Sequence, residues 1–307
     1  MSVAYISHPA CLKHEMGMHH PEQPARLSAI NDRLVASGLG MVLLHHDAIP
    51  ANREHLLLAH DADYIDRIFA TSPNEGHVWL DPDTAMNRHT LEAALHAAGA
   101  VVQAVDLVMQ GAARQAFCAV RPPGHHAERS RSMGFCVFNN VAIGAYHALQ
   151  QHDLERVAIV DFDVHHGNGT EDIISGDDRV LFCSTFQHPF YPHSGYENCA
   201  NNVVNVPLAN GSSGAAFREA VYHQWLPRLR EFEPQLILVS AGFDAHQADD
   251  MAGLNLIDDD FKWVTLKICE VAEQSANGRV VSTLEGGYEL HALARSVEAH
   301  IRAFYDA

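Results

Sequence analysis

Val157-Ala-Ile-Val-Asp-Phe-Asp-Val-His-His-Gly-Asn-Gly-Thr170 is the stretch of sequence that decides the fold. It opens with four apolar residues and no polar alternation, which is typical of a strand buried on both faces of a parallel sheet. Asp161, Asp163 and His165 follow, and in an extended chain these alternate residues project to one side. Such groups are costly to bury unless a cation or hydrogen bonds satisfy them. The alternative is an ordinary polar turn after the strand, which would not require these side chains to converge. The stretch therefore predicts a parallel sheet with a polar site at its carboxyl edge.

The composition narrows the classes of partner. The chain has 307 residues, enough for two average domains or one large α/β domain, and its hydrophobic content of 47% is ample for a core. No apolar run approaches the roughly 20 residues that span a bilayer, so we expect no membrane partner. No secretory signal is visible at the N-terminus, and we expect a cytoplasmic protein by default. The net charge of -18 argues against a nucleic-acid partner and weakly favours a cationic substrate.

The cysteines carry no obvious chemistry. There are six, with no Cys-x-x-Cys pair, and several lie in apolar surroundings. This usage indicates small core residues in a reducing compartment rather than a disulfide framework or a zinc knuckle. The sequence leaves the oligomeric state open.

Apolar strands alternate with helical segments from end to end, which indicates a parallel sheet with helices on both faces. We see no linker, composition break or internal repeat, and therefore expect one domain over residues 1–307. Residues 71–87 read as a polar loop. The expected strands are 3–6, 41–45, 116–120, 157–160, 179–184, 203–206, 235–240 and 279–284. The expected helices are 23–34, 54–70 (broken near Asp61), 88–110, 139–151, 215–230, 257–276 and a last helix to the C-terminus.

Four apolar strands end in polar residues with glycine nearby: His125-His126, Asp161 to His165, Asp244 and Tyr288. Ligands of open parallel sheets bind beyond the carboxyl ends of the strands, where these four segments would meet. Each segment alone has an ordinary structural explanation, such as a helix cap or packing. Together they predict a site.

Asp163, His165 and Asp244 supply two oxygens and one nitrogen, which leaves a position for water or substrate on a bound metal. Catalytic Zn²⁺ fits this pattern, and Fe²⁺ or Co²⁺ would also be accepted. The pair His125-His126 is a candidate acid and base, and Asp161 is placed to orient an imidazole. Tyr288 offers a hydroxyl donor for a developing oxyanion.

Five motifs then show a resemblance to the metal-dependent histone deacetylase family of the arginase/deacetylase superfamily, mostly to its class II branch and bacterial histone deacetylase-like amidohydrolases. In family order, the likeness runs from residue 20 to the C-terminal helix. The resemblance implies a fold with a central, eight-stranded parallel sheet flanked by helices. The motifs are Arg121-Pro-Pro-Gly-His-His-Ala127, Gly134-Phe-Cys-Val-Phe-Asn-Asn140, Asp161-Phe-Asp-Val-His-His-Gly-Asn-Gly-Thr170, Ser240-Ala-Gly-Phe-Asp-Ala-His246 and Glu285-Gly-Gly-Tyr288.

The resemblance also implies residue roles. One Zn²⁺ would be held by Asp163, His165 and Asp244. His126 would be the main general base and acid, and His125 a supporting imidazole bonded to Asp161. Asn168 stands where class II members have asparagine and class I members aspartate.

Further implied roles surround this centre. Gly134, Phe135 and Tyr191 would line a narrow tunnel for an acyl-lysine stem, and Arg26 would belong to an internal channel for acetate release. A K⁺ ion would be held by Asp161, Ser184 and the backbone carbonyls of Asp163, His165 and Thr185.

The expected activity is therefore hydrolysis of an acetyl or acyl group from a lysine side chain or a small N-acylated amine. Acetylpolyamine-selective relatives carry an acidic residue at the tunnel mouth, where we place the uncharged Met251. Asp249 and Asp250 are adjacent, so a shift of one residue would reverse that argument. A binding module with little activity is a further alternative, which the presence of Tyr288 disfavours. A two-Mn²⁺ ureohydrolase is disfavoured by the single Asp-His-Asp set.

Overall fold

The computed structural model describes residues 2–196 and 199–307. Its centre is a sheet of eight parallel strands in the order β2-β1-β5-β10-β9-β6-β7-β8. The unbroken apolar runs become its interior, since every residue of β6, β7, β9 and β10 is buried. The predicted parallel α/β fold is therefore confirmed. The strands are β1 (Val3–Ser7), β2 (Leu44–Asp47), β5 (Gln115–Cys118), β6 (Val157–Asp161), β7 (Val180–Gln187), β8 (Val203–Leu208), β9 (Leu236–Ala241) and β10 (Val280–Leu284).

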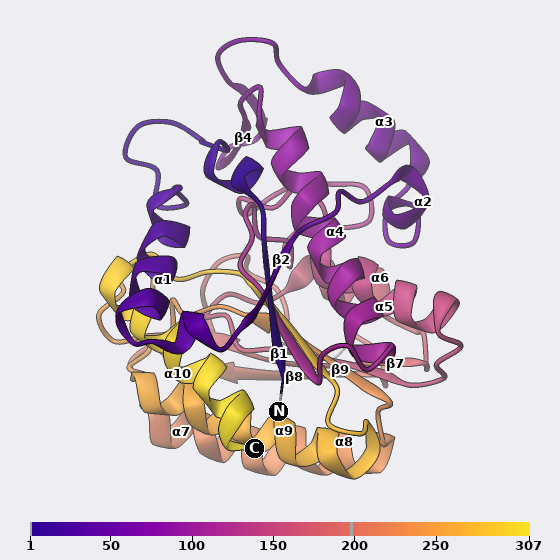
Figure 1. The fold of residues 1–307 in the computed structure, drawn as a ribbon, viewed down its shortest axis with the longest axis vertical. Helices are drawn as coiled ribbons and strands as arrows, with labels where there is room; N and C mark the ends of the chain where they lie inside the picture. The colour runs from indigo at the N-terminus through magenta and orange to yellow at the C-terminus, as the bar shows by residue number, and fades with distance from the viewer. Residues whose placement is uncertain (1, 197–198) are drawn as a thin grey trace.

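Helices cover both faces of this sheet (Figure 1). One layer contains α1 and α7 to α10, with α10 packed between α1 and α9. The other contains α2 and α4 to α6, with α4 against α5. The helices are α1 (Ala25–Ala36), α2 (Arg53–Leu56), α3 (Ala62–Thr71), α4 (Thr90–Met109), α5 (Asn140–Gln151), α6 (Asn168–Ile174), α7 (Gly214–Ala220), α8 (Leu226–Phe232), α9 (Asp258–Ser275) and α10 (Leu290–Asp306).

Some sequence-based boundaries are wrong. Residues 71–87 contain a small antiparallel hairpin, β3 (Val78–Asp81) and β4 (Thr84–Met86). Its strands were not predicted because they are short and lie among turn-forming residues. The strand expected at 41–45 begins later, at Leu44, because a 3₁₀ turn occupies Leu39–Met41. The short helix α6 was missed because two glycines flank its start.

Helix α4 is long and apolar enough, by length and composition, to cross a membrane, and it alone passes that test among the described residues. Its alanines and valines were not counted as one apolar run in the sequence. In the fold it packs against α5 and the strands, and 61% of its most apolar window is buried, as in the core helix of a globular protein.

Candidate active site

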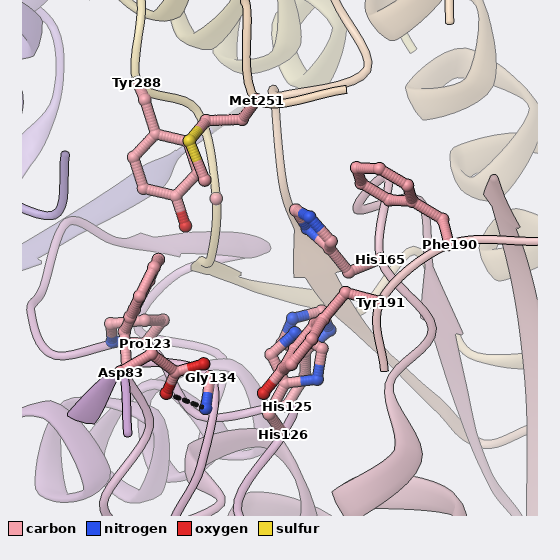
Figure 2. Close-up of a pocket in the computed structure, with 12 residues that line it drawn as sticks. Asp83, Pro123, His125, His126, Gly134, His165, Phe190, Tyr191, Met251 and Tyr288 are labelled. Atoms are coloured by element: carbon pink, nitrogen blue, oxygen red, sulfur yellow. Dashed lines mark hydrogen bonds between the residues drawn. The ribbon is translucent and has the colours of Figure 1, made fainter. Parts of the chain in front are cut away.

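The predicted reactive segments meet at the carboxyl edge of the sheet. The loop after β5 carries His125 and His126, and β6 leads into Asp163 and His165. In Figure 2, Tyr288 and the histidine pair stand on opposite sides of one cavity, and the tyrosine hydroxyl points into the space between them. Parallel pairing puts these strand ends on one edge, which explains how residues more than 100 positions apart come together.

Asp163, His165 and Asp244 form a buried group whose ligand atoms lie within 4.8 Å of one another. His165 Nδ1 is 3.1 Å from Asp163 Oδ1 and 3.2 Å from Asp244 Oδ2. The second contact lacks hydrogen-bond geometry, so Asp244 Oδ2 is buried without a hydrogen bond within the described residues. Burial and the neighbouring Asp163 charge raise the pKa of Asp244 to about 6. A divalent cation would satisfy the orphaned oxygen and offset both carboxylates, so the donor set fits a metal.

Backbone groups hold these carboxylates in place. His165 N–H donates to Asp163 Oδ1 (2.9 Å), and Gly286 N–H donates to Asp163 Oδ2 (2.8 Å). Val164 N–H donates to Asp244 Oδ1 (3.0 Å). A Cβ atom on Gly286 would lie 2.0 Å from Asp244 Oδ2, so only glycine leaves room for the carboxylate there.

The two catalytic candidates among the histidines have different partners. His125 Nδ1 lies 2.9 Å from Asp161 Oδ2, whereas His126 Nδ1 lies 2.8 Å from the amide oxygen of Asn168. Asn168 Nδ2 donates to Glu128 Oε1, which fixes the amide orientation. An amide oxygen only accepts, so His126 carries its proton on Nδ1 and presents a free Nε2 lone pair.

Their charges differ accordingly. Burial opposes the charged form of both imidazoles, but Asp161 and Asp163 outweigh it at His125 and raise its pKa to about 10. Burial, with the nearby imidazoles of His125 and His165, holds the pKa of His126 well below its ordinary value. His126 is therefore the neutral member of the pair, which suits a general base.

The cavity has a volume of about 200 Å³ and largely aromatic walls. The four predicted tunnel residues, Gly134, Phe135, Tyr191 and Met251, all line it. Phe135 meets the ring of Tyr288 edge-on, with centroids 6.0 Å apart. Asp83, Pro123, Phe190 and Gly286 also line the cavity. Pro123 and Gly286 lie within the quoted sequence motifs, whereas Asp83 and Phe190 were not predicted.

Asp83 was missed because it lies in the segment expected to be a loop, at the turn between β3 and β4. Its Oδ1 accepts from Gly134 N–H at 3.1 Å, shown by the dashed line in Figure 2. The carboxylate thus faces the same cavity as Tyr191 and Met251.

The loop after the third metal-type ligand places Met251, and not an acidic neighbour, at the cavity wall. Asp249 is buried behind it, and its Oδ2 accepts from Tyr288 N–H (2.6 Å) and Glu289 N–H (3.0 Å). Its Oδ1 accepts from Met251 N–H at 3.1 Å. Asp249 was treated only as an alignment alternative in the sequence, yet it ties the cavity wall to Tyr288. Asp250 is exposed.

Arg26 lies behind the cavity and does not line it. Its guanidinium carbon is 4.9 Å from the centroid of the Tyr288 ring, and its Nε donates to the carbonyl of Gly287 at 2.6 Å. It is fully buried and also donates to the carbonyl of Glu285 and the carboxylate of Glu22.

The residues expected to hold K⁺ include Asp163 and His165 of the metal-type set, with Asp161 on β6 and Ser184 and Thr185 on β7. Ser184 is the register partner of Asp161 across β6 and β7. Ser184 Oγ is buried and forms no hydrogen bond within the part of the chain that the structure describes. Asp161 Oδ1 accepts from Asp163 N–H at 3.0 Å, and Thr185 is buried next to Ser184. An orphaned hydroxyl beside a carboxylate fits a monovalent cation.

Comparison with known proteins agrees with this geometry. The histone deacetylase domain family matches residues 20–304. A histone deacetylase-like amidohydrolase of Pseudomonas aeruginosa is 37% identical, over 93% of this chain and 81% of its own. The polyamine deacetylase HDAC10 of Mus musculus is 38% identical, over 90% of this chain but only 43% of that protein. The crystal structure of the HDA15 HD domain matches with a TM-score of 0.93 at 31% identity, covering 99% of this chain and 88% of that one.

The fold and the site define an α/β protein of the arginase/deacetylase fold, with a metal-type ligand set at the carboxyl edge of its sheet. This chain belongs to the histone deacetylase family. The resemblance seen in the sequence motifs is thereby confirmed, and the amidohydrolase and deacetylase relatives support a hydrolase.

Proposed function

We propose that this chain is a zinc-dependent amidohydrolase that removes acetyl or acyl groups from lysine side chains or similar N-acylated amines. One observation carries the proposal. The buried set of Asp163, His165 and Asp244 shares a cavity with the neutral imidazole of His126 and the hydroxyl of Tyr288.

When bound, Zn²⁺ would polarise the amide carbonyl and lower the pKa of a water molecule. His126 Nε2 takes the proton of the attacking water, and Asn168 holds the ring for that step. Tyr288 donates its hydroxyl to the carbonyl oxygen as negative charge develops there. A protonated histidine then returns a proton to the leaving amine, which gives a free amine and a carboxylate.

We also propose that K⁺ binds near the catalytic metal, held by Asp161, Ser184 and the carbonyls of Asp163, His165 and Thr185. The orphaned Ser184 hydroxyl supports it. The role of Arg26 in acetate release remains a prediction, and so does the cytoplasmic location.

For the amine, we favour an acyl-lysine side chain. The aromatic walls suit an aliphatic stem, and Met251 carries no charge to select a second ammonium group. An acetylpolyamine is the second candidate, because a polyamine deacetylase is among the relatives and the Asp83 carboxylate faces the cavity.

The test compares steady-state rates on an acetyl-lysine peptide and on N-acetylputrescine, using zinc-loaded protein and protein stripped with a chelator. We expect kcat/KM to favour the peptide, activity to vanish on stripping, and Zn²⁺ to restore it. A strong preference for N-acetylputrescine would overturn the choice of amine. Metal-loaded protein that binds both substrates but hydrolyses neither would overturn the enzyme and leave a binding module. Two tightly held Mn²⁺ ions per chain would instead indicate a ureohydrolase-type centre.

A further inference from the structure

A second group of metal-type side chains lies between α4 and α5, away from the catalytic cavity. Asp106 belongs to the last turns of α4, His147 to α5, and His152 is the C-cap residue of α5. The Nε2 atoms of both histidines lie 2.8 Å from the same oxygen, Asp106 Oδ1. The three ligand atoms lie within 4.8 Å of one another.

The geometry is close to that of a metal centre. Tetrahedral Zn²⁺ with bonds of about 2.0–2.1 Å keeps its ligand atoms about 3.3 Å apart. The carboxylate oxygen would need to withdraw by roughly half an ångström from the two nitrogens. Its side chain is 39% exposed and free to do so, whereas the His147 side chain is only 6% exposed and fixed by packing. The exposure of Asp106 also leaves room for water as a fourth ligand.

The local electrostatics keep the Asp106 carboxylate anionic beside the two imidazoles. Burial opposes the charged form of Asp106, but the two histidines hold the pKa of this carboxyl below its ordinary value. A third imidazole, His55 of α2, lies with its ring centroid 5.5 Å from that of His147. Burial and the neighbouring His147 lower the pKa of His55. The donor set itself is one carboxylate and two imidazoles, which is typical of Zn²⁺, Co²⁺, Ni²⁺ and Cu²⁺.

The missing hydrogen-bond partner of His147 sets the expected metal affinity of this group. Within the described residues, the buried His147 Nδ1 forms no hydrogen bond. Metal-bound histidines usually donate their second ring N–H to an acceptor, and loss of that partner typically costs about 10–100-fold in affinity. Binding at this group should therefore be weaker than at the three catalytic ligands, whose carboxylates are fixed by backbone N–H groups.

We propose that Asp106, His147 and His152 form a second divalent-metal site, of the zinc type, that joins α4 to α5. It is independent of the proposed function. Its helices end where the chain turns into the amino ends of β5 and β6, whereas the catalytic ligands follow the carboxyl ends of β6 and β9. Figure 1 shows α4 and α5 side by side in the layer that carries this group. The ion would act as a clamp between helices and take no part in hydrolysis.

The experiment measures Zn²⁺ binding by equilibrium dialysis at pH 7.5, on the 307-residue protein that already holds its catalytic metal. We expect one further equivalent on the wild type, and loss of that equivalent in His152→Ala. The matched control is His223→Ala, which removes an exposed histidine outside the group and should still take up the further equivalent. Binding should weaken as the pH falls, because imidazole binds metal in its neutral form.

Retention of the catalytic equivalent and of the far-ultraviolet circular dichroism spectrum shows that His152→Ala is folded. Should that variant not fold, Asp106→Asn removes the anionic ligand with little change of shape and should lose the same equivalent. The visible absorption of Co²⁺ bound in the further site gives a second readout, expected in the wild type and His223→Ala and absent from His152→Ala. A wild type that takes up no further equivalent, or a His152→Ala variant that binds it as tightly as the wild type, would overturn the site.

Discussion

At the scale of single residues, the surroundings of each histidine decide its charge. Asn168 gives His126 a neutral acceptor, while Asp161 gives His125 an anionic one. The two adjacent imidazoles therefore differ in protonation although both are buried. This difference supports His126 as the base in the proposed reaction.

Asn168→Asp should move the acid limb of the pH profile of kcat/KM. His126 must be neutral to act as a base, so activity falls as the pH drops through its pKa. An anionic partner raises that pKa by about 1–3 units, so the limb should shift to higher pH by this amount. The measurement is kcat/KM from pH 5 to 9 for both proteins with equal metal content. An unshifted limb would show that Asn168 does not control the base.

Tyr288→Phe should keep the metal and lose most turnover. Removal of one oxyanion donor costs about 10²–10³ in rate, and the hydroxyl is not among the metal-type ligands. Rates on an acetyl-lysine peptide, with zinc content measured on the same samples, test this. Turnover at the wild-type rate would remove Tyr288 from the mechanism.

At the scale of elements, the loop after β9 links the cavity wall to the start of α10. The carboxylate of Asp249 accepts from the backbones of Met251, Tyr288 and Glu289. One buried side chain thus fixes both the wall and the tyrosine.

Asp249→Asn should lower both stability and kcat. The amide replaces one accepting oxygen with a donor, so a backbone N–H loses its partner at a cost of about 1.5–3 kcal/mol. Urea unfolding and steady-state kinetics on the zinc-loaded protein measure the two effects. The adjacent Asp250→Asn is the control, and it should change neither because Asp250 is exposed. Equal behaviour of the two variants would contradict the linking role.

Gly286→Ala tests whether the metal-type carboxylates need the close approach of the Gly286 backbone. The added methyl group would lie 2.0 Å from Asp244 Oδ2 and 2.5 Å from Asp163 Oδ2, so both carboxylates must shift. We expect weaker zinc retention on dialysis against a chelator, with the fold preserved. Gly40→Ala, where the backbone φ is not positive and the added atom would meet no atom closer than 3.4 Å, controls for a general effect of the substitution. Wild-type zinc retention would show that the site tolerates the shift.

At the scale of the whole molecule, buried neutral histidines should make the fold sensitive to acid. Burial lowers the pKa of His300 to about 3 and that of His60 to about 4, and both lie in the core away from the cavity. An unfolded chain takes up these protons near pH 6.5 while the native state does not. Stability is therefore present above this value and is lost as the pH falls toward the native pKa.

Between pH 7 and pH 5 each such histidine should cost about 2 kcal/mol of unfolding free energy. His300→Gln cannot titrate, so its loss of stability over this range should be smaller than that of the wild type by about this amount. Urea unfolding at both pH values gives the difference, and metal loss at low pH is common to both proteins. The exposed His223→Gln should keep the wild-type dependence. An unchanged slope in His300→Gln would argue against the buried-histidine origin.

The sequence by itself determined the sheet and much of the candidate site. Runs such as 157–160 and 236–239 have no polar residue to face water, so they predict strands buried on both sides, and parallel pairing then brings Asp163 and Asp244 to one edge. The long motifs around His126 and Tyr288 indicated the family, because the order of residues in a motif can be recognised without knowing any distance in the structure.

Only the tertiary structure decided which side chains meet across elements. The hairpin that carries Asp83 has short strands whose pairing leaves little periodic signal. The buried role of Asp249 depends on the approach of the backbone around Tyr288. Asp106 and His147, 41 positions apart, meet because α4 packs against α5. Periodicity and motif order are local properties of the chain, whereas these contacts arise from the packing of one element on another.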